Sequence, residues 1–200
     1  MVEEQIRKRD IADKNVLQAM EIVPRHLFVN KHEQRIAYYD SPLPIGEGQT
    51  ISQPYIVAFM TAALNLAPNH KVLEIGTGCG YQTAVLSVLV EKVVSIEYHK
   101  DLAISAKRRL TDLGYSNIDF HNTNGYSGWE SEAPYDRIIC TAAPTAIPEK
   151  LIAQLAPNGI MVLPVGASLT DQSLYILKKD PKGNVSKERS LGVRFVPMLK

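Results

Sequence analysis

The chain has 200 residues, a length that suits one domain with a sizeable core. Its formal net charge of +1 implies no acidic partner, and its two cysteines follow neither a disulfide framework nor a metal-ligand spacing. With no apolar run of about 18 residues and no basic-then-apolar leader, the sequence predicts a cytoplasmic protein with no membrane segment and no metal site.

Residues 1–35 are predicted to form a helical cover on the rest of the chain. Asp13 is a candidate N-cap for a helix that carries Val16 and Met20 at helical spacing and that Pro24 ends. No residue of this segment suggests a chemical role.

Residues 38–54 are rich in proline, glycine and small polar residues, which favours short extended pieces and turns over a long helix. A long irregular segment ahead of a regular core is typical of functional loops. A helix is predicted to resume at Pro54, with Ile56, Val57 and Met60 at helical spacing.

Two hydroxyls of this loop, on Thr50 and Ser52, each have two interpretations. Either can cap the helix that starts at Pro54, and Thr50 with Gln53 fits the capping-box spacing. A hydroxyl at a helix mouth can also hold a substrate carboxylate. The pattern by itself favours the cap, and the two roles are compatible.

Residues 72–83 read Val-Leu-Glu-Ile-Gly-Thr-Gly-Cys-Gly-Tyr-Gln-Thr, which predicts a buried strand, a glycine turn and a helix start. Glycines let the backbone approach a ligand, and free N–H groups at a helix start favour anionic or electron-rich groups. The Gly-x-Gly-x-Gly spacing disfavours a nicotinamide oxidoreductase, whose fingerprint is Gly-x-Gly-x-x-Gly. Alone, the turn is equally consistent with close strand–helix packing.

An acidic residue strengthens the ligand interpretation. Residues 92–96 are predicted to form the next strand, and Glu97 ends it about 20 residues after Gly76, where a carboxylate accepts both ribose hydroxyls of an adenosine ligand. Together the strand, turn, helix, strand and acid predict an adenosine-type cofactor rather than a solvated glutamate.

A helix is predicted after this strand, with Leu102, Leu110 and Leu113 on one face and an end at Gly114. The basic run at 107–109 falls on the solvated face of this helix, so no basic patch for nucleic acid is expected.

Residues 117–121 are predicted to form the third strand, and Asn124 and Gly125 a turn at its carboxyl end, beside the cofactor. Trp129 is interpreted as a packing residue. The strand expected within 133–144 ends in small residues, which leave room for a ligand.

The C-terminal part is predicted to contain a helix at 147–155, a turn at 156–159, strands at 160–166, 173–178 and 191–197, and a hairpin turn at 182–184. The alternation of strands and helices predicts an α/β fold: a doubly wound, mostly parallel sheet with helices on both faces and an antiparallel C-terminal edge.

Residues 72–83 resemble motif I of the S-adenosylmethionine-dependent methyltransferases. The loop at 43–55 resembles the signature of one subfamily, the protein-L-isoaspartate O-methyltransferases, and shorter matches follow in the same order at 134–136, 141–143, 163–166 and 194–197. The resemblance runs from about residue 3 to the end. It implies one Rossmann-like domain, residues 1–200, with the cover and substrate loop in 1–55 and the cofactor-binding core in 56–200.

The resemblance also implies a reaction. A methyl group passes from S-adenosyl-L-methionine to the free carboxylate of L-isoaspartyl residues in damaged proteins and peptides, leaving S-adenosyl-L-homocysteine. The ester then lets the following backbone nitrogen close a succinimide, which hydrolyses partly to normal aspartate. Because the acceptor carboxylate is already ionised near neutral pH, no general base is required.

The resemblance assigns roles residue by residue. Ser52 falls on the active-site hydroxyl, which we expect to orient the carboxylate rather than act as a nucleophile. The cofactor-binding residues implied are Thr50, Ser52, Gly76, Thr77, Gly78, Gly80, Glu97, Tyr98, Asn124 and Gly125.

Three positions stay open. Asn124 replaces the aspartate usual in the family, which keeps a carbonyl acceptor but loses the charge. Glu74 either orients the turn or contacts the amino group of the cofactor. Arg194 either lies near the substrate or is a surface arginine.

Two other functions share part of this pattern. A methyltransferase acting on a small carboxylate or an RNA base would share everything from Val72 onward, but it gives no reason for the pattern at 43–55. A non-catalytic module that binds an adenosine cofactor would keep the glycine turn and Glu97 but has no need of Ser52. The absence of an exposed apolar stripe favours a monomer.

Overall fold

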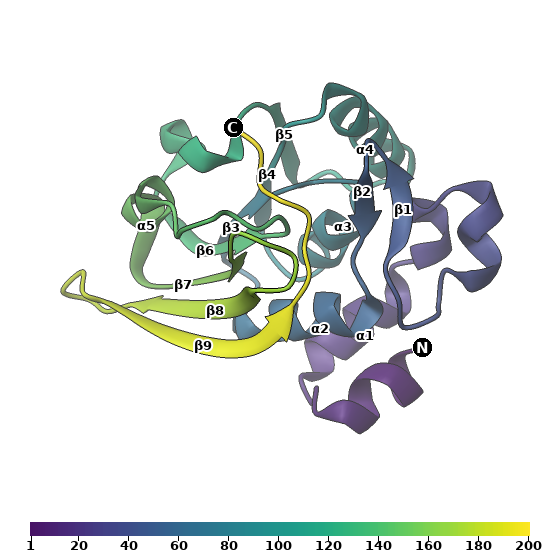
Figure 1. Cartoon of the computed structure of the whole chain (residues 1–200), viewed down its shortest axis with the longest axis horizontal. Helices are drawn as coiled ribbons and strands as arrows, with labels where there is room; N and C mark the ends of the chain where they lie inside the picture. The colour runs from purple at the N-terminus through teal and green to yellow at the C-terminus, as the bar shows by residue number, and fades with distance from the viewer.

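The computed structural model describes residues 1–200, built around one large sheet. Its strands are β3 (Lys71–Ile75), β4 (Lys92–Glu97), β5 (Ile118–Asn122), β6 (Tyr135–Cys140), β7 (Leu155–Val165), β8 (Gln172–Lys179) and β9 (Val185–Val193). Their spatial order is β5-β4-β3-β6-β7-β8-β9 (Figure 1). The strands from β5 to β7 pair in parallel, whereas β8 and β9 add antiparallel. The predicted fold class is confirmed.

Five α-helices and six short helical turns accompany the sheets. The helices are α1 (Lys14–Ile22), α2 (Pro54–Ala63), α3 (Tyr81–Ser87), α4 (Lys100–Asp112) and α5 (Glu149–Gln154). The short turns are η1 (Val2–Ile6), η2 (Arg7–Arg9), η3 (Arg25–Phe28), η4 (Lys31–Ile36), η5 (Gly125–Ser127) and η6 (Glu130–Glu132).

Side chains alternate between the two faces of the sheet and so form two hydrophobic clusters. On β3, Val72 joins the larger cluster, with residues of α1, α2, α3 and α4. The next residue, Leu73, points to the other face and joins the smaller cluster, with Leu151 of α5. The near-continuous apolar runs of the central strands follow from this burial on both sides.

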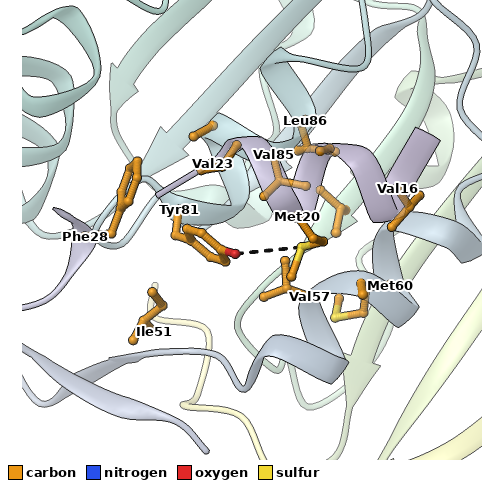
Figure 2. Packing of buried hydrophobic residues seen from close by; sticks show 14 of the residues in the cluster. Val16, Met20, Val23, Phe28, Ile51, Val57, Met60, Tyr81, Val85 and Leu86 are labelled. Atoms are coloured by element: carbon orange, nitrogen blue, oxygen red, sulfur yellow. Dashed lines mark hydrogen bonds between the residues drawn. The ribbon is translucent and has the colours of Figure 1, made fainter. Parts of the chain in front are cut away.

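The N-terminal cover packs on the core through α1. Asp13 caps this helix as predicted, because its Oδ1 accepts the backbone N–H groups of Asn15 and Val16 at 2.9 and 3.2 Å. Figure 2 shows Met20 of α1 beside residues of α2 and α3, with the Tyr81 hydroxyl donating to its sulfur at 3.8 Å. Burying one such side chain contributes about 1.5–3 kcal/mol.

The segment at 38–54 contains a hairpin of two short strands, β1 (Leu43–Gly46) and β2 (Gln49–Ile51), in agreement with the predicted extended pieces. Its turn uses Glu47 and Gly48 at φ of 52° and 68°. Strand alternation directs Ile51 into the core (Figure 2) and leaves Thr50 exposed. Ser52 follows immediately, half-buried at the edge of the hairpin.

Three boundaries near the C-terminus differ from the prediction. The last strand, β9, occupies Val185–Val193 rather than 191–197. The chain leaves the sheet after Val193 and crosses the carboxyl ends of the parallel strands (Figure 1). The predicted turn at 156–159 lies inside β7 as a register shift against β6, with Asn158 at a φ of 62°. α5 is shorter than the predicted helix.

None of the helices combines the length and the apolar character needed to cross a bilayer. Cys79 and Cys140 are free and buried. Arg109, part of the basic run on α4, does not simply face solvent: its guanidinium donates to the backbone carbonyl of Cys79 at 2.8 Å.

Candidate active site

The glycine turn lies where the strand order reverses. The chain passes from β3 to β4 and β5 on one side, while β6 lies on the other side of β3. In open α/β sheets such a switch point, at the carboxyl ends of the strands, is where ligands bind. The N–H groups of Gly76 and Thr77 both donate to the carbonyl of Ile96, at 2.8 and 3.2 Å, which fixes the turn against β4.

Glu97, at the end of β4, is held by two backbone groups. Its Oε2 accepts the N–H of Gly78 at 2.8 Å and its Oε1 accepts the N–H of His99 at 2.9 Å. The residue is 6% exposed. Each carboxylate oxygen keeps a further lone pair, so this side chain is oriented in advance to accept two more hydrogen bonds.

Glu74 lies below the turn in a network of hydroxyls. Its Oε2 accepts from Thr83 and Ser95, each at 2.6 Å, and the Ser95 hydroxyl is 2.6 Å from that of Thr77. Its Oε1 has no hydrogen-bond partner. Burial raises the pKa of Glu74 to about 8, against the opposing effect of the two hydroxyl donors. This arrangement supports the first interpretation of Glu74, as a residue that orients the turn.

A cavity opens above the turn, between the β1–β2 hairpin and the carboxyl ends of β3, β4 and β6. Eight predicted cofactor residues line it: Thr50, Ser52, Gly76, Thr77, Gly78, Glu97, Tyr98 and Gly125. Two do not. Gly80 has a φ of 90° as the N-cap of α3, and Asn124 caps η5 by accepting the N–H of Tyr126 at 2.9 Å. These two residues are outside the lining of the cavity, but each is next in sequence to residues that line it.

The cap predicted for Ser52 or Thr50 at the start of α2 is wrong. The residue at the N-cap position is Gln53, and its side chain makes no capping bond. The N–H of Tyr55 instead donates to Oδ1 of Asp40 at 3.1 Å, a residue 15 positions earlier. The hydroxyls of Ser52 and Thr50 therefore remain free to bind a ligand.

A second cavity adjoins the first and shares four residues with it: Thr50, Ser52, Thr141 and Val196. Arg194 is the only charged residue that lines this acceptor groove, as we call the second cavity. Arg194 is also exposed to solvent, so both of its interpretations fit the structure. Ser52, on the wall common to the two cavities, and Arg194 are thus two polar side chains of the same groove.

A family model described as protein-L-isoaspartate (D-aspartate) O-methyltransferase matches residues 1–200. The chain belongs to this family. A protein-L-isoaspartate O-methyltransferase of Gloeobacter violaceus is 48% identical over 200 residues, which cover all of this chain and 97% of the relative.

Solved structures agree with this assignment. A protein-L-isoaspartate O-methyltransferase structure superposes with a TM-score of 0.88 at 30% identity, over 98% of this chain and 65% of that longer chain. A second, described as a putative enzyme of the same name from Plasmodium falciparum in complex with S-adenosyl-L-homocysteine, gives a TM-score of 0.85 at 27% identity, over 99% and 96% of the two chains.

Several residues of this family member's site were not predicted from its sequence. Thr141, after β6, donates its hydroxyl to the carbonyl of Gly76 at 2.6 Å and lines both cavities. The small residues that follow β6 were the available signal for it. The C-terminal residues Val196–Leu199 also line the cofactor cavity, and Gln172 fixes them by bonding both backbone groups of Phe195, at 2.6 and 3.0 Å. No local pattern indicates this contact.

Replacing Gly76 with alanine is expected to destabilise the protein by about 3 kcal/mol and to weaken cofactor binding. The residue has a φ of 100°, and a Cβ would overlap the Thr141 hydroxyl. Left-handed backbone costs about 1–2 kcal/mol, and overpacking adds about 1–3 kcal/mol. Urea unfolding measures the loss.

Gly183→Ala is the matched control, because Gly183 has a φ of 89° but an added Cβ would meet nothing within 4 Å. It should lose only the backbone part, about 1 kcal/mol. Equal losses in the two variants would show that the contact with Thr141 is unimportant.

Proposed function

We propose that this chain is an S-adenosylmethionine-dependent protein-L-isoaspartate O-methyltransferase that uses the cavity above the glycine turn for its cofactor and the acceptor groove for the isoaspartyl residue. The observation that carries the proposal is the juxtaposition of the two cavities. They meet at Ser52, whose hydroxyl is free, and the groove contains one cation, Arg194, and no carboxylate.

The residues of the first cavity fit S-adenosylmethionine. Both oxygens of Glu97 are oriented by backbone N–H groups and keep lone pairs for the two ribose hydroxyls. Gly76 and Gly78, both at positive φ, let the backbone come close to the ligand. Tyr98, 46% exposed beside Glu97, offers an aromatic face for the adenine.

The acceptor groove fits a carboxylate that is bound rather than activated. An isoaspartyl carboxylate is ionised at neutral pH, so no residue needs to remove a proton from it. The Ser52 hydroxyl donates to one of its oxygens, and Arg194, which lines the same groove, supplies the opposite charge. Both interactions hold the acceptor oxygen toward the shared wall of the cavities.

The bound cofactor supplies a methyl group on a positively charged sulfur, which departs as a neutral thioether. The chain contributes alignment and exclusion of water. The segment Val196–Leu199 and the β1–β2 hairpin wall the cavity on two sides. Alignment of this kind lowers the activation barrier by roughly 7–11 kcal/mol.

We propose that residues 1–200 act as one catalytic domain, with the helical cover and the substrate loop in 1–55 and the cofactor-binding core in 56–200. Direct packing of α1 on α2 and α3 supports a single unit. We also propose that the enzyme acts as a cytoplasmic monomer, independent of nucleic acid and membranes. Its two buried, unpaired cysteines suit a reducing compartment. Light scattering of the purified protein and cell fractionation test these two points.

Transfer of labelled methyl to an isoaspartyl peptide, compared with the same peptide containing normal aspartate, tests the function. We expect base-labile methyl ester on the isoaspartyl peptide alone. Cofactor binding without transfer to either peptide would favour a binding module. Transfer to RNA or to a small carboxylate instead would favour another methyltransferase class.

Ser52→Ala is expected to lower kcat/KM for the isoaspartyl peptide by roughly 30-fold, because a hydrogen bond to a charged group contributes about 1.5–3 kcal/mol. The affinity for S-adenosylhomocysteine, measured by calorimetry, should change less than about threefold, because Glu97 and Tyr98, and not Ser52, are the residues expected to bind the ribose and the adenine.

Ser52→Thr keeps the hydroxyl and should retain most of the activity, whereas Ser105→Ala, on the exposed face of α4, should match the wild type. A Ser52→Ala enzyme with unchanged turnover and unchanged KM would remove Ser52 from the mechanism.

A further inference from the structure

The loop at 38–54, which carries Ser52, depends on a helix cap supplied from outside α2. The first turn of α2 leaves the N–H of Tyr55 without an intrahelical partner, and neither Gln53 nor Ser52 accepts it. The partner is Oδ1 of Asp40, which precedes the β1–β2 hairpin. The cap therefore joins the two ends of the loop that contains the predicted catalytic hydroxyl.

The second oxygen of Asp40 holds the residue that directly follows Ser52. Its Oδ2 accepts from the Gln53 side chain at 2.6 Å and from the Arg9 guanidinium at 2.7 Å. Arg9 in turn lies 3.6 Å above the ring of Tyr55. One carboxylate thus fixes two residues that follow Ser52, through the side chain of Gln53 and the backbone of Tyr55.

The segment that carries Asp40 is itself held rigidly. Arg25 is completely buried, and its guanidinium donates to the carbonyls of Ala37 and Ser41 at 2.7 and 3.5 Å. These two carbonyls flank Asp40 in the sequence. The backbone that carries Asp40 is therefore anchored to a buried side chain of the core.

Ser52 is the other residue that is placed to accept the Tyr55 N–H, which Asp40 accepts in the structure. It lies three residues before Tyr55, so a helix that began one residue earlier, with Ser52 in place of Gln53 at the N-cap, would bring its hydroxyl to the Tyr55 amide as the N3 donor. An orphan amide at a helix start is costly, and serine is among the best residues for satisfying it. Without Asp40, the Ser52 hydroxyl becomes the nearest local acceptor in sequence for Tyr55.

We propose that Asp40 is a positioning residue for methyl transfer: by capping α2 in place of Ser52, it keeps the Ser52 hydroxyl available to the acceptor carboxylate. Asp40 lines neither cavity, so it acts through Ser52 and not by touching substrate or cofactor. The inference rests on the proposed function, because it assigns Ser52 to the acceptor.

A double-mutant cycle tests the inference. Asp40→Ala, Ser52→Ala and the double variant are assayed with the isoaspartyl peptide, with calorimetry for S-adenosylhomocysteine and thermal unfolding alongside. We expect Asp40→Ala to lower kcat/KM about tenfold with cofactor affinity unchanged, and the double variant to match Ser52→Ala within about twofold. Multiplicative losses in the double variant, or an unchanged Asp40→Ala enzyme, would overturn the proposal.

Two further variants separate positioning from simple stabilisation. Asp40→Asn keeps the Oδ1 acceptor for Tyr55 and should retain activity within about threefold. Asp40→Ala/Gln53→Asn supplies a neutral cap at the N-cap position, which frees Ser52 without adding a charge to the groove that Gln53 lines, and should recover most of the kcat/KM that Asp40→Ala loses. Recovery of Tm without recovery of kcat/KM would also overturn the proposal.

These variants also cover the case in which Asp40→Ala does not fold, since both retain a cap on α2. Failure of this inference is distinct from failure of the proposed function. If the wild type does not methylate the isoaspartyl peptide, the function is wrong; if it does, and the Asp40 variants behave like it, only the role of Asp40 is wrong.

Discussion

Replacing Glu97 with alanine is expected to lower the affinity for S-adenosylmethionine roughly 100- to 10,000-fold. Each hydrogen bond from a ribose hydroxyl to this carboxylate contributes about 1.5–3 kcal/mol, and two such bonds give about 3–6 kcal/mol. The variant also removes the acceptor for the N–H groups of Gly78 and His99, so the turn loses its restraint. Isothermal titration with S-adenosylhomocysteine measures the effect directly.

Two variants calibrate this result. Glu97→Gln keeps one oxygen acceptor and loses the charge, and should fall between the wild type and alanine, at roughly 10- to 100-fold weaker binding. Glu91→Ala removes an exposed glutamate before β4 and should bind like the wild type. If Glu97→Ala bound the cofactor within threefold of the wild type, Glu97 could not be the ribose acceptor.

The parts of this protein that local sequence predicts well are those whose physical cause is local. The turn at Gly76 follows from glycine spacing after an apolar run, and the cap of α1 follows from Asp13 at the start of a periodic segment. The mostly parallel sheet follows from alternating strands and helices. Each of these needs only neighbours within a few residues, so periodicity and residue type suffice.

The errors have a common cause in contacts between distant residues. Ser52 has the right spacing for a cap, yet Asp40 satisfies the same amide from 15 residues away. Phe195 was assigned to a strand, yet its backbone bonds the Gln172 side chain and its chain leaves the sheet. Thr141 enters the site only because β6 lies beside β3, a pairing across 60 or more residues. Tertiary structure decides such partners, and a single sequence does not encode them in a local pattern.

Glu74→Gln is expected to change the pH dependence of stability more than any other substitution considered. The folded protein raises the pKa of Glu74 from about 4.5 to about 8 by burial. Between these values the unfolded chain is ionised at this position while the folded chain keeps a proton. The free energy of unfolding of the wild type therefore falls as pH rises through this window, by a total of about 5 kcal/mol from this one group.

The glutamine side chain is neutral at every pH, so the variant loses this slope. Its Oε1 can still accept from Thr83 and Ser95, while its amide occupies the place of the unpartnered oxygen, where unsatisfied donors cost about 1–3 kcal/mol. That cost is independent of pH, so it lowers the free energy of unfolding of the variant by the same amount at every pH and leaves its pH dependence unchanged. The stability of Glu74→Gln relative to the wild type should therefore rise by up to about 1.4 kcal/mol per pH unit between pH 5 and 8.

Urea unfolding at four or five pH values in this window measures the difference, and subtraction of the wild-type curve removes the titration of all other groups. The charge on Glu97 is the one charged neighbour that acts on Glu74, and it favours the protonated form, so Glu97→Gln should lower the pKa of Glu74 and narrow the pH window over which the free energy of unfolding falls. Glu91→Gln, at an exposed position, should leave this window as it is. A difference between Glu74→Gln and wild type that stays flat from pH 5 to 8 would mean that Glu74 is ionised in the folded protein throughout, with its charge stabilised by the hydroxyls of Thr83 and Ser95.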